Sequence, residues 1–307
     1  NLLPPVLTSK DGAAYRERAM AVLPKDTKFT PLMTCYMTDD TDPDDVEYGF
    51  KQGIFTGVKI YPANATTNSA AGVTDFRKIE RVLARMEKIG MRLLIHCEDV
   101  DPALDVFDRE AAFIDRKLIP MTKNFPGLKI IFEHLSSKYG VEYVRSAAPQ
   151  IGATITPYHL RLNRTDWLGW GNRPYMYCMP VIKTEQDRLA LVDAATSGEE
   201  CFFLGTDSAP HSVAKKLAVV GAAGLFNSPV SIETYAQVFD EQGKLDKLEA
   251  FASLNGPKHY GMAPNKDTIT LEKTDWVAPM EILVEGDEER ALLYRGGETI
   301  PWKVVSA

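Results

Sequence analysis

Phe202-Phe203-Leu204-Gly205-Thr206-Asp207-Ser208-Ala209-Pro210-His211 is the stretch of sequence that decides the fold. It is a short apolar run that ends at a carboxylate, and a histidine follows four residues later. An apolar run bounded by Gly and Pro is typical of a buried strand, and an α/β protein places its chemistry at the exits of such strands. The stretch therefore predicts that Asp207 is both a metal ligand and a proton carrier.

The same alternation of apolar strand, polar exit and amphipathic helix recurs from Phe29 onward, which predicts parallel strands joined by crossover helices. The predicted strands are Thr30 to Tyr36, Gly57 to Tyr61, Arg92 to His96, Leu128 to His134, Gly152 to Thr156 and Cys201 to Thr206. The helices predicted between them are Pro43 to Gln52, Asp75 to Gly90, Phe107 to Phe125, Tyr139 to Ala148 and Glu185 to Ser197.

A closed TIM-type (β/α)8 barrel needs eight strands, and this pattern supplies six. Either the sheet is open or two βα units precede the first residue. We expect the second, an α/β barrel with about six of its eight βα units present. The absence of repeats and linkers predicts a single domain over 1–307, with 265–307 as a C-terminal extension. Within it, Leu160 to Lys183 is too long for a turn and is expected to cover the mouth of the site.

Composition narrows the range of partners. The chain has 307 residues, is 45% hydrophobic and carries a net charge of -7, so we expect a small-molecule substrate and no nucleic acid. No apolar run approaches the roughly 20 residues that cross a bilayer, so no membrane partner is expected. The four cysteines form no Cys-x-x-Cys pair, which favours a reducing compartment such as the cytoplasm.

Four functional side chains stand at or near the exits of four predicted strands: Lys59, His96, His134 and Asp207. Because the exits of a parallel barrel open on one face, these residues are expected to converge into a set of nitrogen and oxygen ligands suitable for zinc. Taken singly, each histidine is more often a satisfied core residue. The alternative for Lys59 is an ion pair with an acid such as Asp207 or Glu98, whereas burial as a neutral amine would allow carbamate formation with carbon dioxide.

The remaining candidates follow from position. His211 lies just beyond Asp207 and is expected to bind a substrate carboxylate, whereas His159 and His259 are expected to be structural. The small, polar loop Ala63 to Gly72 suits a lid, with Thr66 and Thr67 closing onto substrate, although such loops are more often only mobile.

Several of these stretches closely resemble the bacterial-type (class II) dihydroorotase family of the amidohydrolase superfamily. The resemblance extends from the first residue to the C-terminal tail. The stretches that carry it are Thr30 to Tyr36, Lys59 to Ser69, Phe132 to His134, Ala153 to Pro157 and Leu204 to His211.

The resemblance implies reversible closure of N-carbamoyl-L-aspartate to L-dihydroorotate in de novo pyrimidine biosynthesis, and it suggests a homodimer. It implies two zinc ions bridged by Lys59 as N6-carboxylysine, with His96 and His134 on one metal and Asp207 on the other. Asp207 would also be the general acid and base. The implied substrate-binding residues are Asn1, Thr66, Thr67, Met179, His211 and Ala223.

One departure from the family pattern is the lack of its His-x-His pair, which supplies two ligands to the metal that Asp207 would share. Three interpretations remain open. The first is an active dihydroorotase whose front segment precedes residue 1. The second is a catalytically incomplete structural or binding subunit, and the third is another cyclic amidohydrolase such as a hydantoinase or dihydropyrimidinase.

Overall fold

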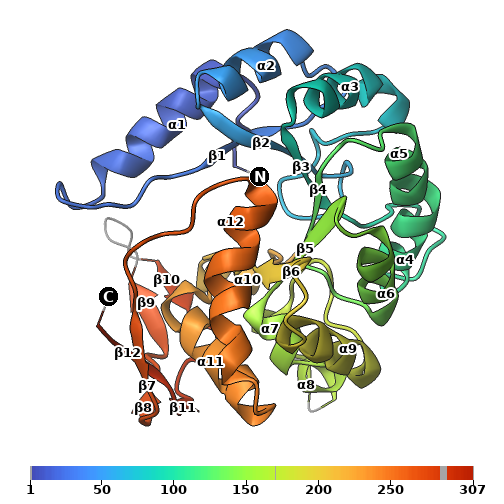
Figure 1. Cartoon of the computed structure of the whole chain (residues 1–307). Coiled ribbons are helices and arrows are strands. Elements are labelled where there is room, and N and C mark those ends of the chain that lie inside the picture. Colours follow the sequence, from blue (N-terminus) through green and yellow to red (C-terminus); the bar gives the residue numbers. More distant parts are fainter. Residues whose placement is uncertain (1, 170, 284–288, 307) are drawn as a thin grey trace. The chain divides into compact units, whose positions relative to one another are not determined.

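The computed structural model describes residues 2–169, 171–283 and 289–306 of the chain (Figure 1). Its internal contacts divide the chain into two compact units, Asn1–Glu133 and His134–Ala307. The prediction of a single domain over 1–307 stays a prediction.

The first unit is built on four parallel strands. They are β1 (Met33–Tyr36), β2 (Phe55–Ile60), β3 (Arg92–His96) and β4 (Ile130–Glu133), paired in that order. These strands are almost continuous apolar runs because a parallel sheet is covered on both faces, and Val58, Leu93 and Ile131 are fully buried. Each strand falls within or close to its predicted range.

Helices alternate with these strands along the chain. They are α1 (Ser9–Ala21), α2 (Pro43–Lys51), α3 (Glu80–Ile89) after a 3₁₀ turn at Phe76–Ile79, α4 (Arg109–Phe113) and α5 (Ile119–Asn124), the last two joined by a π-helical turn at Ile114–Leu118. Asp42 caps α2 by accepting a hydrogen bond from the Asp44 amide, and Gly90 ends α3 at a φ of 71°.

Helix α1 is absent from the sequence prediction. Its apolar residues do not follow a clear helical period, but Thr8 and Asp11 form a capping box at its start. Ser9 then donates its hydroxyl to Asp45 of α2 at 2.6 Å, which fixes α1 against its neighbour. The capping box is the signal that could have revealed this helix.

The second unit contains two parallel strands, β5 (Ile151–Ile155) and β6 (Phe202–Leu204), with Ala153 paired to Phe202 and Ile155 to Leu204. Its longer helices are α6 (Lys138–Ala147), α9 (Glu185–Thr196) and α11 (Ser231–Glu241), and its shorter ones α7 (Pro157–Arg161), α8 (Arg164–Leu168), α10 (Val213–Lys216) and α12 (Asn255–Tyr260). Short 3₁₀ turns lie at Pro174–Met176, Ser228–Val230 and Leu245–Lys247, and a π turn at Ala250–Leu254. The segment from Leu245 to Leu254 is therefore irregularly helical.

Three antiparallel pairs of short strands complete this unit. They are β7 (Thr270–Glu272) with β12 (Lys303–Ser306), β8 (Trp276–Val277) with β11 (Thr299–Ile300), and β9 (Glu281–Leu283) with β10 (Arg290–Leu292). Residues of the predicted extension share a buried cluster with the rest of the unit. The cluster comprises Tyr158, Cys178, Ile182, Leu225, Val230, Ala278, Leu293, Tyr294 and Ile300.

The alternation of parallel strands with helices confirms the predicted α/β class of the barrel kind. Within the described ranges, every helix is too short or too polar to cross a bilayer.

Candidate active site

Lys59, His96 and Glu133 lie at the carboxyl ends of β2, β3 and β4 in the first unit. His96 is in register with Glu133, and Lys59 is in register with Leu94, two residues before His96. Since side chains two residues apart on a strand share a face, all three leave the same face of the sheet. Lys59 is 6% exposed and forms an ion pair with Glu133. The acid beside Lys59 is thus Glu133, a partner that only the strand register reveals.

Two tyrosines enclose this group. Tyr61 stacks on Tyr36 with ring centroids 5.4 Å apart, and the ring of His96 lies 5.9 Å from that of Tyr61. The Lys59 Nζ sits 5.0 Å from the Tyr61 ring centroid, a cation–π distance. Burial raises the pKa of Tyr36 to about 12, so its hydroxyl stays neutral. Among the described residues this buried hydroxyl has no hydrogen-bond partner.

His96 is 1% exposed, and its Nε2 lies 2.6 Å from Oε2 of the fully buried Glu98. The second carboxylate oxygen of Glu98 has no hydrogen-bond partner within the described part of the chain. An imidazole, a lysine that can carry a carbamate, and orphaned buried oxygens form a donor set that fits zinc. Over the same ranges, no three His, Cys, Asp or Glu side chains gather into a metal-binding group.

The predicted lid, residues 63–72, is a hydrogen-bonded loop closed at its base by a bridge between Pro62 and Val73. The Thr66 amide donates to Ser69 Oγ at 2.9 Å, and Ser69 Oγ donates back to the Thr66 carbonyl at 2.6 Å. Thr66 and Thr67 remain half-buried at the tip. The loop is a compact turn, and its closing onto substrate stays a prediction.

In the second unit, Asp207 follows β6 with its backbone in the left-handed region, at a φ of 44°. Its Oδ2 accepts a hydrogen bond from the hydroxyl of Tyr158 at 2.8 Å. Burial, and then the charge of Asp207, raise the pKa of Tyr158 well above its usual value, so the phenol remains a donor. Sequence reasoning missed Tyr158, although it lies directly after the Thr156-Pro157 exit of β5.

His134 follows β4 and also has a left-handed backbone, with a φ of 46°. Its amide donates to Thr154 Oγ1 at 2.7 Å, which fixes the residue against β5. Gly205 packs directly against Thr154, since a Cβ on Gly205 would lie 2.4 Å from Thr154 Cβ. Glycine is therefore required at position 205 for β6 to approach β5.

His159 and His259 are used structurally, in agreement with the sequence analysis. His159 Nε2 donates to the Pro180 carbonyl at 3.1 Å, and its Nδ1 lies 2.8 Å from Thr156 Oγ1. Burial, followed by the charge of Lys183, lowers the pKa of His159 to about 3, so this imidazole is neutral. The ring of His259 packs on Phe203 at 5.6 Å between centroids.

His211 is half-buried, and its Nε2 donates to the Ala223 carbonyl at 3.0 Å. Burial is the main cause that lowers the pKa of His211. Gly224, next to Ala223, has a φ of 133°, and a Cβ there would lie 2.5 Å from Ala209 Cβ. This close approach holds the His211 loop against the Ala223 segment.

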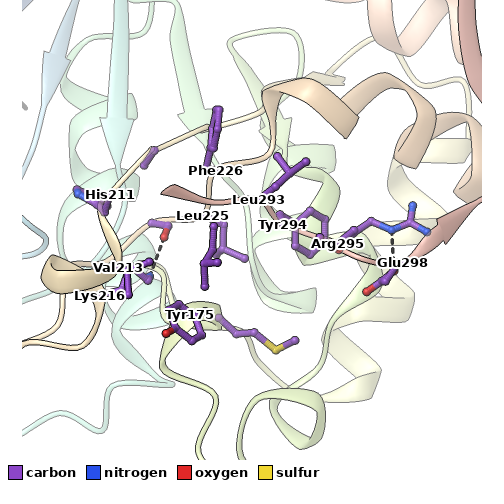
Figure 2. Close-up of a pocket in the computed structure, with 15 residues that line it drawn as sticks. Tyr175, His211, Val213, Lys216, Leu225, Phe226, Leu293, Tyr294, Arg295 and Glu298 are labelled. Carbon is purple, nitrogen blue, oxygen red and sulfur yellow. Dashed lines mark hydrogen bonds and ion pairs between the residues drawn. The ribbon is translucent and has the colours of Figure 1, made fainter. Parts of the chain in front are cut away.

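Figure 2 shows the cavity beside His211, which has a volume of about 180 Å³. His211, Lys216 and Gly224 contribute to its wall, and Arg295 and Glu298 lie at the opposite end. Arg295 is 5% exposed and donates to Glu298 at 2.9 Å. The cavity therefore has two charged ends and an apolar middle.

The predicted site residues divide between the two units. Lys59, His96, Thr66 and Thr67 belong to the first, and His134, Met179, Asp207, His211 and Ala223 to the second. Asn1 lies outside the described residues.

Comparisons with known proteins agree with one another. The model of the amidohydrolase family matches residues 6–274. A dihydroorotase of Parasynechococcus marenigrum is 52% identical over 304 residues, which make up 99% of this chain and 87% of that protein.

Solved structures give the same picture. A dihydroorotase of Saccharomyces cerevisiae, crystallised with 5-fluoroorotic acid, matches with a TM-score of 0.91 at 33% identity, over 99% of this chain and 87% of that one. An L-hydantoinase (dihydropyrimidinase) of Arthrobacter aurescens matches with a TM-score of 0.78 at 16% identity, over 99% of this chain and 73% of that one. The second likeness is one of fold alone.

Proposed function

The chain belongs to the amidohydrolase family, and we infer that it is a cyclic amide hydrolase with dihydroorotase activity in pyrimidine biosynthesis. It interconverts N-carbamoyl-L-aspartate and L-dihydroorotate. The observation that carries this conclusion is the 52% identity to a dihydroorotase across 99% of the chain. The family resemblance found in the sequence is thereby confirmed. The hydantoinase interpretation is disfavoured, because that likeness is only 16% in sequence.

The enzyme is metal-dependent, as its family is. We propose that Lys59 as a carbamate, His96, His134 and Asp207 are among the ligands of two zinc ions, the others being the His-x-His pair of the family pattern, which these 307 residues do not contain. When bound, zinc supplies Lewis-acid chemistry and activates water for attack on the ring amide. Formation of the carbamate replaces the ammonium that now faces Glu133 by an anion, so a cation nearby restores the charge balance. The same four residues are donors of the type zinc prefers.

Asp207 is proposed as the general acid and base. In hydrolysis its carboxylate takes a proton from the attacking water and delivers it to the departing ring nitrogen, and the reverse transfer accompanies ring closure. Tyr158 supports this role because its hydroxyl, 2.8 Å from Oδ2, restricts the rotation of the carboxylate. Asp207 lies beyond the end of β6 and has a left-handed backbone.

Binding of the substrate carboxylate is proposed for His211 and the backbone of Ala223, together with Asn1, and contact with the pyrimidine ring for the backbone of Met179. The hydrogen bond between His211 and the Ala223 carbonyl supports this proposal, since it brings two of these groups together. Thr66 and Thr67 are proposed as the lid.

Location and assembly complete the proposal. The four cysteines are free thiols, of which Cys35, Cys97 and Cys178 are buried, as suits a protein of the cytoplasm. A homodimer stays a prediction.

The decisive test combines zinc analysis with turnover of L-dihydroorotate, hydantoin and dihydrouracil by the purified full-length gene product. Two zinc ions per chain and preferential hydrolysis of dihydroorotate, lost in Asp207→Ala, would support the proposal. Preference for hydantoin or dihydrouracil would favour a hydantoinase instead. A folded protein without metal or turnover would contradict the proposal and leave the interpretation as a structural or binding subunit.

A further inference from the structure

Lys216, at the end of α10, is a buried lysine that no step of the proposed chemistry uses. It is 6% exposed, and burial lowers its pKa to about 8. Its Nζ donates to three backbone carbonyls: those of Tyr177 at 2.8 Å, Ala222 at 3.0 Å and Gly224 at 2.8 Å. An ammonium has three donors, and here each is matched by one carbonyl.

The three carbonyls belong to two segments that lie far apart in sequence. Ala222 and Gly224 flank Ala223, and Tyr177 lies two residues before Met179. The Gly224 amide also donates to the Tyr177 carbonyl at 3.0 Å, so the segments are joined directly as well as through Lys216. The bond from His211 to the Ala223 carbonyl fixes the other side of the same peptide.

We propose that Lys216 is a positioning residue that holds the Ala222–Gly224 and Tyr177–Met179 segments in the geometry that binds the carboxylate and ring of the substrate. This inference rests on the proposed function, because it takes these backbones to be the substrate contacts.

The chemistry of the peptide group gives Lys216 a second effect on binding. The Ala222 carbonyl and the Ala223 N–H belong to one peptide unit. An ammonium on the carbonyl polarises the unit and makes its N–H a stronger donor, as in any hydrogen-bonded chain. Through this peptide Lys216 strengthens a donor for the substrate carboxylate without touching the substrate.

The cost of burying an ammonium also points to a specific role. An apolar side chain would fill the same space without desolvating a charge, and neutral carbonyls compensate a buried cation less fully than a carboxylate does. A lysine here thus contributes a defined geometry of three directed bonds.

The neighbouring Lys215 provides a matched control. It lies in the same short helix and is exposed, and its charge, like that of Lys216, lowers the pKa of His211. Lys216→Met and Lys215→Met therefore remove equal charges, but only the first removes the three bonds to carbonyls.

The test compares these variants in the metal-loaded enzyme. For Lys216→Met we expect the Kd of 5-fluoroorotate, measured calorimetrically, and the KM of dihydroorotate to rise about tenfold, with a smaller fall in kcat. Both constants should stay within twofold in Lys215→Met. Lys216→Arg keeps the positive charge and the N–H donors but arranges the donors on a planar guanidinium. It should therefore recover part of the affinity lost in Lys216→Met. A folded Lys216→Met with unchanged Kd and KM would overturn the proposal.

Hydrogen exchange separates this inference from the proposed function. In Lys216→Met the amides of Ala223 to Leu225 and of Cys178 should exchange faster than in Lys215→Met, whether or not the protein acts on dihydroorotate. Equal exchange in the two variants would refute the positioning role. Failure of the unaltered protein to bind 5-fluoroorotate or hydrolyse dihydroorotate would instead refute the function. If Lys216→Met does not fold, Lys216→Gln allows the same comparisons.

Discussion

Acidification from pH 7 to pH 5 is expected to remove about 2 kcal/mol of unfolding free energy from the second unit through His159 alone. This imidazole is fully enclosed, and its two nitrogens are engaged by Thr156 and the Pro180 carbonyl. Protonation would place a charge in this site and turn the nitrogen that faces the Thr156 hydroxyl from an acceptor into a donor. The native state therefore resists protonation that the unfolded chain accepts.

The magnitude follows from the two pKa values. The pKa of His159 is lowered from 6.5 to about 3 in the native state, mainly by burial. A lowered pKa means that the contribution is fully present above pH 6.5 and is lost as the pH falls toward 3. A pH of 5 lies roughly 1.5 units below the unfolded-state pKa, so the unfolded chain is protonated while the native state is not. At about 1.36 kcal/mol per unit, this difference lowers the free energy of unfolding by about 2 kcal/mol.

Tryptophan fluorescence is a suitable probe, because all four tryptophans lie in the unit that contains His159. Urea unfolding at pH 7, 6 and 5 would be compared in the unaltered protein, His159→Gln and His259→Gln. Loss of metal in acid affects all three alike. We expect a steep decline in the first and third and a shallower one in His159→Gln. Parallel declines in all three would refute the reasoning.

Further predictions concern the proposed catalytic groups. Tyr158→Phe removes the 2.8 Å bond to Asp207, so the acidic limb of the kcat/KM profile should move to higher pH, and an unmoved limb would contradict the role of Tyr158. Gly224→Ala meets a φ of 133° and a contact of 2.5 Å, so calorimetric unfolding should show a loss of about 1–3 kcal/mol and KM should rise, whereas neutral behaviour would exclude the close approach. His211 donates Nε2 to a carbonyl and has a lowered pKa, so only its imidazolium can also donate Nδ1 to a carboxylate. Calorimetry of 5-fluoroorotate in several buffers should show proton uptake near neutral pH that is absent in His211→Asn, and equal uptake in both would rule this out.

The six parallel strands and the helices between them were predictable because each carries its own signal. The apolar run before Asp207 and the Asp42-Pro43 helix start are local, and both lie where the sequence indicated them. Helix α1 was missed because its apolar residues are poorly ordered along the helix and only its capping box marks it. The strand ends differ by a few residues from prediction because pairing, which sets them, is not local.

The partners of the site residues could not be predicted in the same way. Lys59 meets Glu133 because of how the strands pair. The register aligns Lys59 with Leu94 and His96 with Glu133, so Lys59 and Glu133 lie on the same face of the sheet. Lys215 and Lys216 are adjacent and chemically identical, yet one is exposed and the other binds three carbonyls. Only tertiary structure separates them.

The left-handed backbones of Asp207 and His134 set a limit on laboratory evolution of this enzyme. A residue other than glycine gives up about 1 kcal/mol in that region, and glycine or asparagine recovers part of it. A library sorted only for heat resistance should therefore accumulate glycine or asparagine at these two positions and lose turnover as it does so. Selection for thermal stability must be combined with selection for growth without pyrimidines if the side chains of Asp207 and His134 are to be kept.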